Sequence, residues 1–205
     1  MPEQHPFRQF LLLAFALLLP CFAVWSAASA WLAIPAIGFT NMILTGWLPD
    51  FVAGVYVQGS KALLVTQFGE LDGRLVPANQ AGDTIAYLLD HRILSYSMPF
   101  YTALHFATPG EKRPGSFFVG LVVLYALLVT GMVSLSLKDM MVNLGTQFLQ
   151  HPTAAVPPAN LIALVYQFNV LILPTLAPVL LWAWQSRNTP LLQQMIEPLT
   201  REGTP

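Results

Sequence analysis

The charged residues of this chain leave long intervals that contain no Asp, Glu, Lys or Arg. The four longest intervals run from Arg8 to Asp50, from Arg92 to Glu111, from Arg113 to Lys138 and from Asp139 to Arg187. A helix that crosses a bilayer needs about 20 mainly apolar residues, and a charge is costly in the hydrocarbon. Each interval is therefore predicted to contain a candidate membrane span.

The composition points to lipid rather than water as the surrounding solvent. Only 9% of the 205 residues are charged and 55% are hydrophobic, whereas a soluble domain averages roughly 25% charged residues. A soluble protein so poor in charge would expose large apolar patches, which associate in water. We therefore predict an integral membrane protein. The formal net charge of -1 and the nine scattered Lys and Arg residues argue against nucleic acid as a partner.

Four transmembrane helices are predicted, which makes the fold an all-α membrane protein with a small β element. Their approximate bounds are Gln9–Ala33, Ile93–Thr108, Phe117–Leu137 and Leu161–Trp184. The short apolar stretch Ile34–Leu48 contains Pro35 and Gly38, which favours an interfacial segment over a further span. A cleaved signal peptide competes for the first helix, because Ala28-Ser29-Ala30 resembles a cleavage site. The apolar run continues through Ile34, which favours a retained helix.

Residues 50–92 form the only sizeable polar segment between spans and are predicted to hold an outward-facing β-hairpin. Val55–Val57 and Leu63–Thr66 are rich in strand-forming residues, and Gln58–Lys61 between them supplies turn residues. In a second turn at Glu70–Arg74, Gly73 is expected to have a positive φ.

The distribution of Lys and Arg predicts the orientation, because short cytoplasmic loops are enriched in these residues. Four spans put both termini on one side, with Arg8, Lys112, Arg113, Arg187 and Arg201 there and Lys61, Arg74, Arg92 and Lys138 opposite. We expect one membrane domain over residues 1–205, with both termini cytoplasmic, periplasmic segments at 50–92 and 138–160, and a cytoplasmic tail at 185–205. Trp182 and Trp184 beside Arg187 are typical of an aromatic anchor at the inner interface.

No catalytic, cofactor or metal site is predicted from the sequence. Cys21 is the only cysteine, and a thiol deep in an apolar helix stays protonated and inert. The four histidines have no metal-ligand spacing, and no Gly-rich phosphate loop is present. A membrane enzyme is therefore the least favoured class of function.

Five residues in the predicted spans are candidates for contacts between helices or with a partner: Tyr101, His105, Tyr166, Gln167 and Asn169. Tyr101 and His105 are one helical turn apart and share a face. Such a pair can relay a proton, but His105 lies near the end of its span within reach of water, and we favour that interpretation. The amides of Gln167 and Asn169 need partners in hydrocarbon and commonly bond across helices. We favour such adhesion, within the chain or to a partner, over a substrate path.

Three stretches of the chain resemble the exosortase H-associated membrane proteins of bacteria. They are Arg8–Trp25, which ends in Pro-Cys-Phe-Ala-Val-Trp; Ser95–Pro99 with Ala103-Leu104 and Ala107-Thr108; and Tyr166–Phe168 with Leu171–Pro174 and Ala177–Trp182. The resemblance covers nearly the whole chain. Asn169 departs from it, because a small residue such as Gly is expected at that position.

The resemblance implies a bacterial inner-membrane protein that accompanies exosortase H, a transpeptidase-like membrane protease that acts on a C-terminal sorting signal. An exosortase needs a catalytic Cys with Arg and His at the outer membrane face, and Cys21 has no such surroundings. The resemblance therefore implies a non-catalytic accessory protein of a protein-sorting system, with membrane lipid and exosortase H as partners. The alternative function is a small transporter or channel component.

Overall fold

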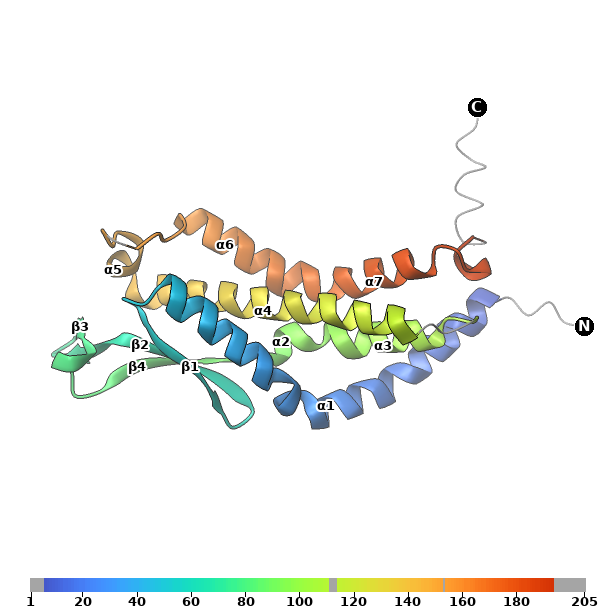
Figure 1. The fold of residues 1–205 in the computed structure, drawn as a ribbon, viewed down its shortest axis with the longest axis horizontal. Coiled ribbons are helices and arrows are strands. Elements are labelled where there is room, and N and C mark those ends of the chain that lie inside the picture. Colours follow the sequence, from blue (N-terminus) through green and yellow to red (C-terminus); the bar gives the residue numbers. More distant parts are fainter. Residues whose placement is uncertain (1–5, 111–113, 153, 194–205) are drawn as a thin grey trace, which may run out of the picture. The chain divides into compact units, whose positions relative to one another are not determined.

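The computed structural model describes residues 6–110, 114–152 and 154–193. Within these residues, three helices are long and apolar enough to cross a membrane: Phe7–Trp47, Pro114–Leu144 and Ala159–Ser186. They correspond to α1 (Pro6–Trp47), α4 (Pro114–Leu144) and a continuous run of α6 (Ala159–Gln167), the π-helical turn η2 (Phe168–Ile172) and α7 (Leu173–Ser186) (Figure 1). The mainly helical membrane-protein class is thus confirmed, whereas the predicted count of four spans is not.

The predicted span Ile93–Thr108 is divided into two short helices. They are α2 (Arg92–Ser95) and α3 (Ser97–Ala107), and α3 has 11 residues. At 1.5 Å per residue α3 is about 17 Å long, well short of the roughly 30 Å hydrocarbon core. Pro99 lies in the first turn of α3, where its missing N–H costs little, so a new helix begins here.

The first helix is much longer than predicted, because α1 has 42 residues and continues through Pro20 and Pro35. Residues Ile34–Trp47, expected to form an interfacial segment, are instead its C-terminal part. Proline removes one backbone hydrogen bond. Packing offsets that loss, since one face of this part is buried, with Ala36 and Leu44 both 0% exposed. At about 63 Å, α1 exceeds the length that a bilayer crossing requires.

The polar segment between α1 and α2 forms an antiparallel sheet of four strands. They are β1 (Val52–Gln58), β2 (Lys61–Leu71), β3 (Arg74–Pro77) and β4 (Thr84–Leu89), and β2 pairs with each of the others. The residues expected in a hairpin lie in β1 and β2. Asp72 and Gly73 join β2 to β3 with φ of 51° and 73°, as a two-residue turn requires, so the prediction for Gly73 is confirmed. β3, β4 and the short 3-10 helix η1 (Ala78–Gln80) were not predicted.

The predicted polar connection at 138–160 begins later than expected, because α4 continues to Leu144 and α5 (Thr146–Leu149) follows. Lys138 forms an ion pair with Asp139, and Met140 and Leu144 are 0% and 2% exposed. These contacts let the helix continue past its first charges. Lys112, Arg113 and Arg201, and the predicted tail beyond residue 193, lie outside the described residues.

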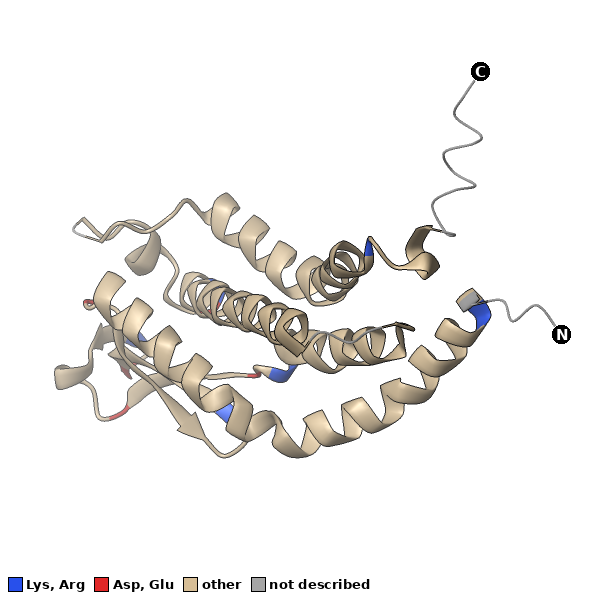
Figure 2. Ribbon diagram, turned by 45° about the vertical axis from the view of Figure 1, so that its right-hand side comes forward, with Lys and Arg blue, Asp and Glu red and all other residues tan. Residues whose placement is uncertain are grey.

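The chain divides into two compact units, and each long helix contributes to both. The terminal unit consists of the described residues within 1–27, 96–124 and 174–205, and the sheet unit of those within 28–95 and 125–173. Figure 2 shows the acidic residues on or beside the strands of the sheet unit, while α1 carries no charge after its first turn.

The core of the sheet unit is centred on Phe51, which is fully buried. Its ring centroid lies 5.6 Å from that of Phe68 in β2, 5.0 Å from Phe148 in α5 and 4.8 Å from His151. The backbone N–H of Val55 in β1 donates to Oδ1 of Asn41 in α1 at 2.8 Å. The sheet is therefore packed against the end of α1 and against the connection that follows α4.

Candidate functional site

A polar junction in the terminal unit joins three helices. The hydroxyl of Tyr101 in α3 donates to Oε1 of Gln185 in α7 at 2.6 Å, and Tyr101 is fully buried. Nε2 of Gln185 in turn donates to the backbone carbonyl of Ser116 in α4 at 2.8 Å. The Gln185 amide thereby has both a donor and an acceptor partner on neighbouring helices.

Aromatic rings and a close backbone approach fix the position of Tyr101. Its ring stacks on Phe117 at 5.8 Å, and the His105 ring lies 5.7 Å from it and 5.1 Å from Phe117. A Cβ atom at Gly120 would lie only 2.1 Å from the Tyr101 hydroxyl oxygen. Glycine is therefore required at residue 120 for the phenol to reach Gln185.

Trp182 links two further elements of the terminal unit. Its indole Nε1 donates to Oγ1 of Thr108 at 2.7 Å, and its ring stacks on Phe10 of α1 at 5.1 Å. Trp182 is 7% exposed, whereas Trp184 is 57% exposed and lies under the Arg187 guanidinium. Of the two tryptophans predicted as an anchor, only Trp184 faces outward.

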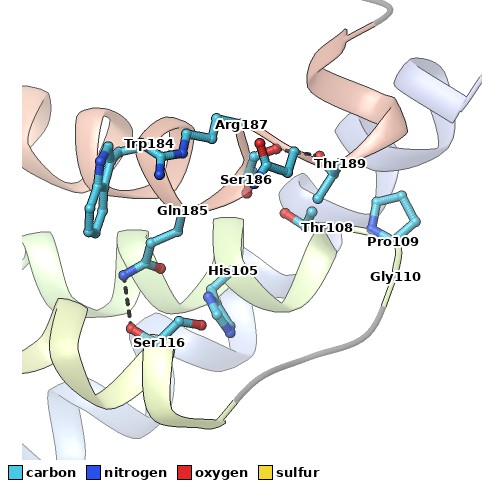
Figure 3. A pocket seen from close by; sticks show the side chains of 11 residues that line it. His105, Thr108, Pro109, Gly110, Ser116, Trp184, Gln185, Ser186, Arg187 and Thr189 are labelled. Carbon is cyan, nitrogen blue, oxygen red and sulfur yellow. Dashed lines mark hydrogen bonds between the residues drawn. The ribbon is translucent and has the colours of Figure 1, made fainter.

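A cavity of about 420 Å³ opens beside the junction. Its lining consists of His105, Thr108, Pro109, Gly110, Ser116 and residues 184–189. Figure 3 shows the Gln185 side chain reaching towards Ser116, with His105 beside them. The lining offers hydroxyl, amide and imidazole groups and one guanidinium, a set able to bind a small polar or anionic molecule.

The polar contact of Tyr101 in the junction is with an amide rather than with a basic side chain. The nearest acceptor of the Tyr101 hydroxyl among the described residues is the Gln185 amide oxygen at 2.6 Å, and a neutral amide does not take up a proton near neutral pH. Within the described residues, no group of three or more His, Cys, Asp or Glu side chains could hold a metal ion. Tyr101 thus serves a contact between helices in this arrangement.

The other three candidate contact residues, Tyr166, Gln167 and Asn169, lie in the sheet unit and do not form one site. Tyr166 is half-buried, with Nζ of Lys138 5.2 Å from its ring centroid. Nδ2 of Asn169 donates to the carbonyl of Val165, one turn earlier in its own helix, at 2.9 Å. Gln167 is exposed. The Asn169 amide nitrogen therefore bonds within its own helix, while the Gln167 amide faces outward from the third long helix.

The π-helical turn η2 has a local cause in the sequence. Pro174 follows it and has no N–H for the carbonyl of Val170, while the N–H of Leu173 bonds to the carbonyl of Phe168. A wider turn redistributes the backbone bonds, as π-bulges do. Asn169 lies in this turn and is 8% exposed, at the position where the family resemblance leads one to expect a small residue.

A buried histidine that the sequence did not single out lies between β4 and α2. His91 is 1% exposed, and neither its ring nitrogens nor the Ser95 hydroxyl has a hydrogen-bond partner among the described residues. Burial lowers the pKa of His91, against the opposing influence of the Ser29 backbone and Asp90. The neutral ring is therefore favoured in the folded chain.

Sequence reasoning missed Gln185 for a specific reason. An amide in an apolar helix was the signal that identified Gln167 and Asn169, and Gln185 carries the same signal. The predicted span ended at Trp184, one residue too early to include it. The roles of Gly120 and Ser116 had no such signal, because they depend on a backbone approach between helices.

Comparison with known proteins gives one match. The model of the family described as exosortase H-associated membrane protein matches residues 4–189. Searches found no matching protein among curated proteins and no matching solved structure.

Proposed function

Because this chain belongs to the exosortase H-associated membrane proteins, we propose that it is a non-catalytic accessory subunit that binds exosortase H in a bacterial inner membrane. The family is described as an associated membrane protein rather than as an enzyme. In this proposal the subunit supports the sorting of secreted proteins, and the partner enzyme performs the chemistry.

The observation that carries the proposal is the outward-facing amide of Gln167. It belongs to an apolar helix of spanning length, and Leu164, Phe168 and Leu171 on the same face are 64%, 46% and 68% exposed. Lipid offers an amide no hydrogen-bond partner, and an unpaired amide in an apolar medium is costly. A spanning helix of the partner would cover this face and supply the missing bonds.

The proposed orientation has four passes and both termini in the cytoplasm. The contacts of Trp182 with Phe10 and Thr108 bring the beginning of α1 and the end of α3 to the C-terminal part of α7. These contacts support an even number of passes, and in this proposal α2 and α3 together form the fourth. Reporters active only outside the cytoplasm test this orientation when fused after Gly59 and after Gly203. Activity of the fusion after Gly203 contradicts it.

The partner proposal is tested with Gln167→Leu and the matched control Asn169→Leu. Interhelical polar contacts in membranes contribute about 0.6 kcal/mol on average and about 1.7 kcal/mol at most. We therefore expect Gln167→Leu to bind exosortase H about three- to twentyfold more weakly in detergent, with an unchanged protein level. Asn169→Leu should retain wild-type binding. Equal binding by both variants would contradict the proposal and would favour the transporter alternative, in which polar side chains line a wet cavity.

A further inference from the structure

One end of the sheet lies alongside the spanning helices. The short helix α2 packs against η2, the π-helical turn of the third long helix. Leu94 of α2 packs on α4, where a Cβ atom at Gly131 would lie 3.0 Å from Leu94 Cδ2. Because Lys138 is the first charged residue after Arg113, the charge-free part of α4 ends at Leu137. Gly131 lies about 9 Å before that end at 1.5 Å per residue. The short helix α2 is therefore level with the charge-free, apolar part of α4.

The turn between β1 and β2 lies at the same end of the sheet as α2. Ala62 pairs with Leu89, the last residue of β4, and Nζ of Lys61 lies 3.8 Å from Oδ2 of Asp90. The backbone N–H of Arg92 donates to the other carboxylate oxygen of Asp90 at 3.0 Å. Figure 1 shows the β1–β2 turn and α2 towards one end of the sheet and β3 towards the other.

The exposed side chains at this end are apolar with flanking cations. Tyr56, Val57, Leu88 and Ile93 are 54%, 49%, 58% and 40% exposed. Tyr56 and Leu88 both pair with Leu63 of β2, so they lie on one face of the sheet. Lys61 and Arg92 are exposed beside them. We call these six residues the tip surface.

We propose that the tip surface is immersed in the bilayer leaflet on the sheet side and binds the phosphates of anionic phospholipids through Lys61 and Arg92. Apolar rings and branched chains enter the region between headgroups and acyl chains, while Lys and Arg extend their charged ends to the headgroups. The depth of α2 brings the lipid to these residues, and their exposure makes them accessible to it; the Lys61 side chain stays 45% exposed beside Asp90. This inference does not depend on exosortase H as a partner.

Leu88 and Leu71 make a matched pair for the test. Leu71 is 48% exposed and lies at the far end of β2 from Lys61, about 33 Å away at 3.3 Å per residue. Each is changed to Cys in a Cys21→Ala background and spin-labelled, in full-length protein reconstituted in phosphatidylethanolamine and phosphatidylglycerol vesicles. We expect dissolved oxygen to collide with the Leu88→Cys label more often than a water-soluble nickel complex does, and the reverse for Leu71→Cys. Equal nickel accessibility of the two labels would overturn the immersion.

The headgroup contacts are tested by the phosphatidylglycerol that co-purifies with each variant. A basic residue near an anionic membrane surface contributes about a fivefold gain in lipid binding. Lys61→Gln and Arg92→Gln should therefore each lower phosphatidylglycerol retention about fivefold, whereas Arg74→Gln, near the β2–β3 turn, should leave it unchanged. Wild-type retention by the Lys61→Gln/Arg92→Gln double variant would overturn the assignment of these cations to lipid phosphates.

Discussion

Each of the two units of this protein is stabilised by interactions of its own, and these interactions differ in kind between the units. In the terminal unit, polar side chains cross from helix to helix, as in the bonds of Tyr101 to Gln185 and of Trp182 to Thr108. In the sheet unit, buried polar groups such as Thr40, Ser136 and Asn169 bond within their own helices. An apolar core around Phe51 adds to the cohesion there, together with the bond between Val55 of β1 and Asn41 of α1. Polar bonds fix the rotation of helices about their axes, while an apolar core contributes more free energy.

The largest effect is expected from Phe51→Ala in the sheet unit. The fully buried ring contacts Phe68, Phe148 and His151, so its removal leaves a cavity that costs about 3–5 kcal/mol. Denaturant titration in detergent measures the loss of stability. Phe39→Ala is the control, because Phe39 is 51% exposed. A loss no greater than that of the control would mean that the sheet core does not stabilise the unit.

A smaller effect is expected from Gly120→Ala in the terminal unit. The new methyl group would collide with the Tyr101 hydroxyl, and forced overpacking costs about 1–3 kcal/mol. Thermal unfolding in detergent compares it with Gly115→Ala, where no heavy atom lies within 4 Å of the added Cβ. Gly131→Ala in the sheet unit should fall between the two, since the flexible end of Leu94 can move. Equal stability of all three variants would contradict the rigid junction.

The smallest effect is a pH dependence that originates from His91. Its pKa is lowered in the folded chain by burial, so below the ordinary value of about 6.5 the unfolded chain binds a proton that the folded chain does not. Stability should therefore be complete above that pH and decline as the pH falls further. His91→Gln should flatten the decline, as measured by thermal unfolding between neutral and mildly acidic pH. If His91→Gln left the slope of stability against pH unchanged, the decline would come from titratable groups other than His91.

The sequence predicted those parts of the fold that depend on local composition. Charge-free intervals identified α4 and the α6–α7 run, and the turn residues at Asp72-Gly73 identified the β2–β3 connection. The continuity of α1 through Pro35 accompanies the burial of one face of its C-terminal part, where Ala36 and Leu44 are both 0% exposed, and no local pattern reports that burial. The division at Tyr96 follows from Pro99 in the first turn of α3, a backbone effect that hydropathy does not register.

The candidate site was predictable only in part. The spacing of Tyr101 and His105 correctly put their rings on one face, 5.7 Å apart. The partner of Tyr101 could not be predicted, because Gln185 is 84 residues away along the chain. A single sequence does not show which of several polar side chains meet across such a separation.

The shortness of α3 has a consequence for the biogenesis of the chain. An 11-residue helix is too short to leave the insertion machinery as an independent span, for which about 20 apolar residues are needed. The residues that hold it, Gly120 in α4 and Gln185 in α7, are synthesised later. The segment from β4 to α3 therefore takes its final position only after α4, and its polar bond to Gln185 only after the last helix, so the order of folding differs from the order of synthesis.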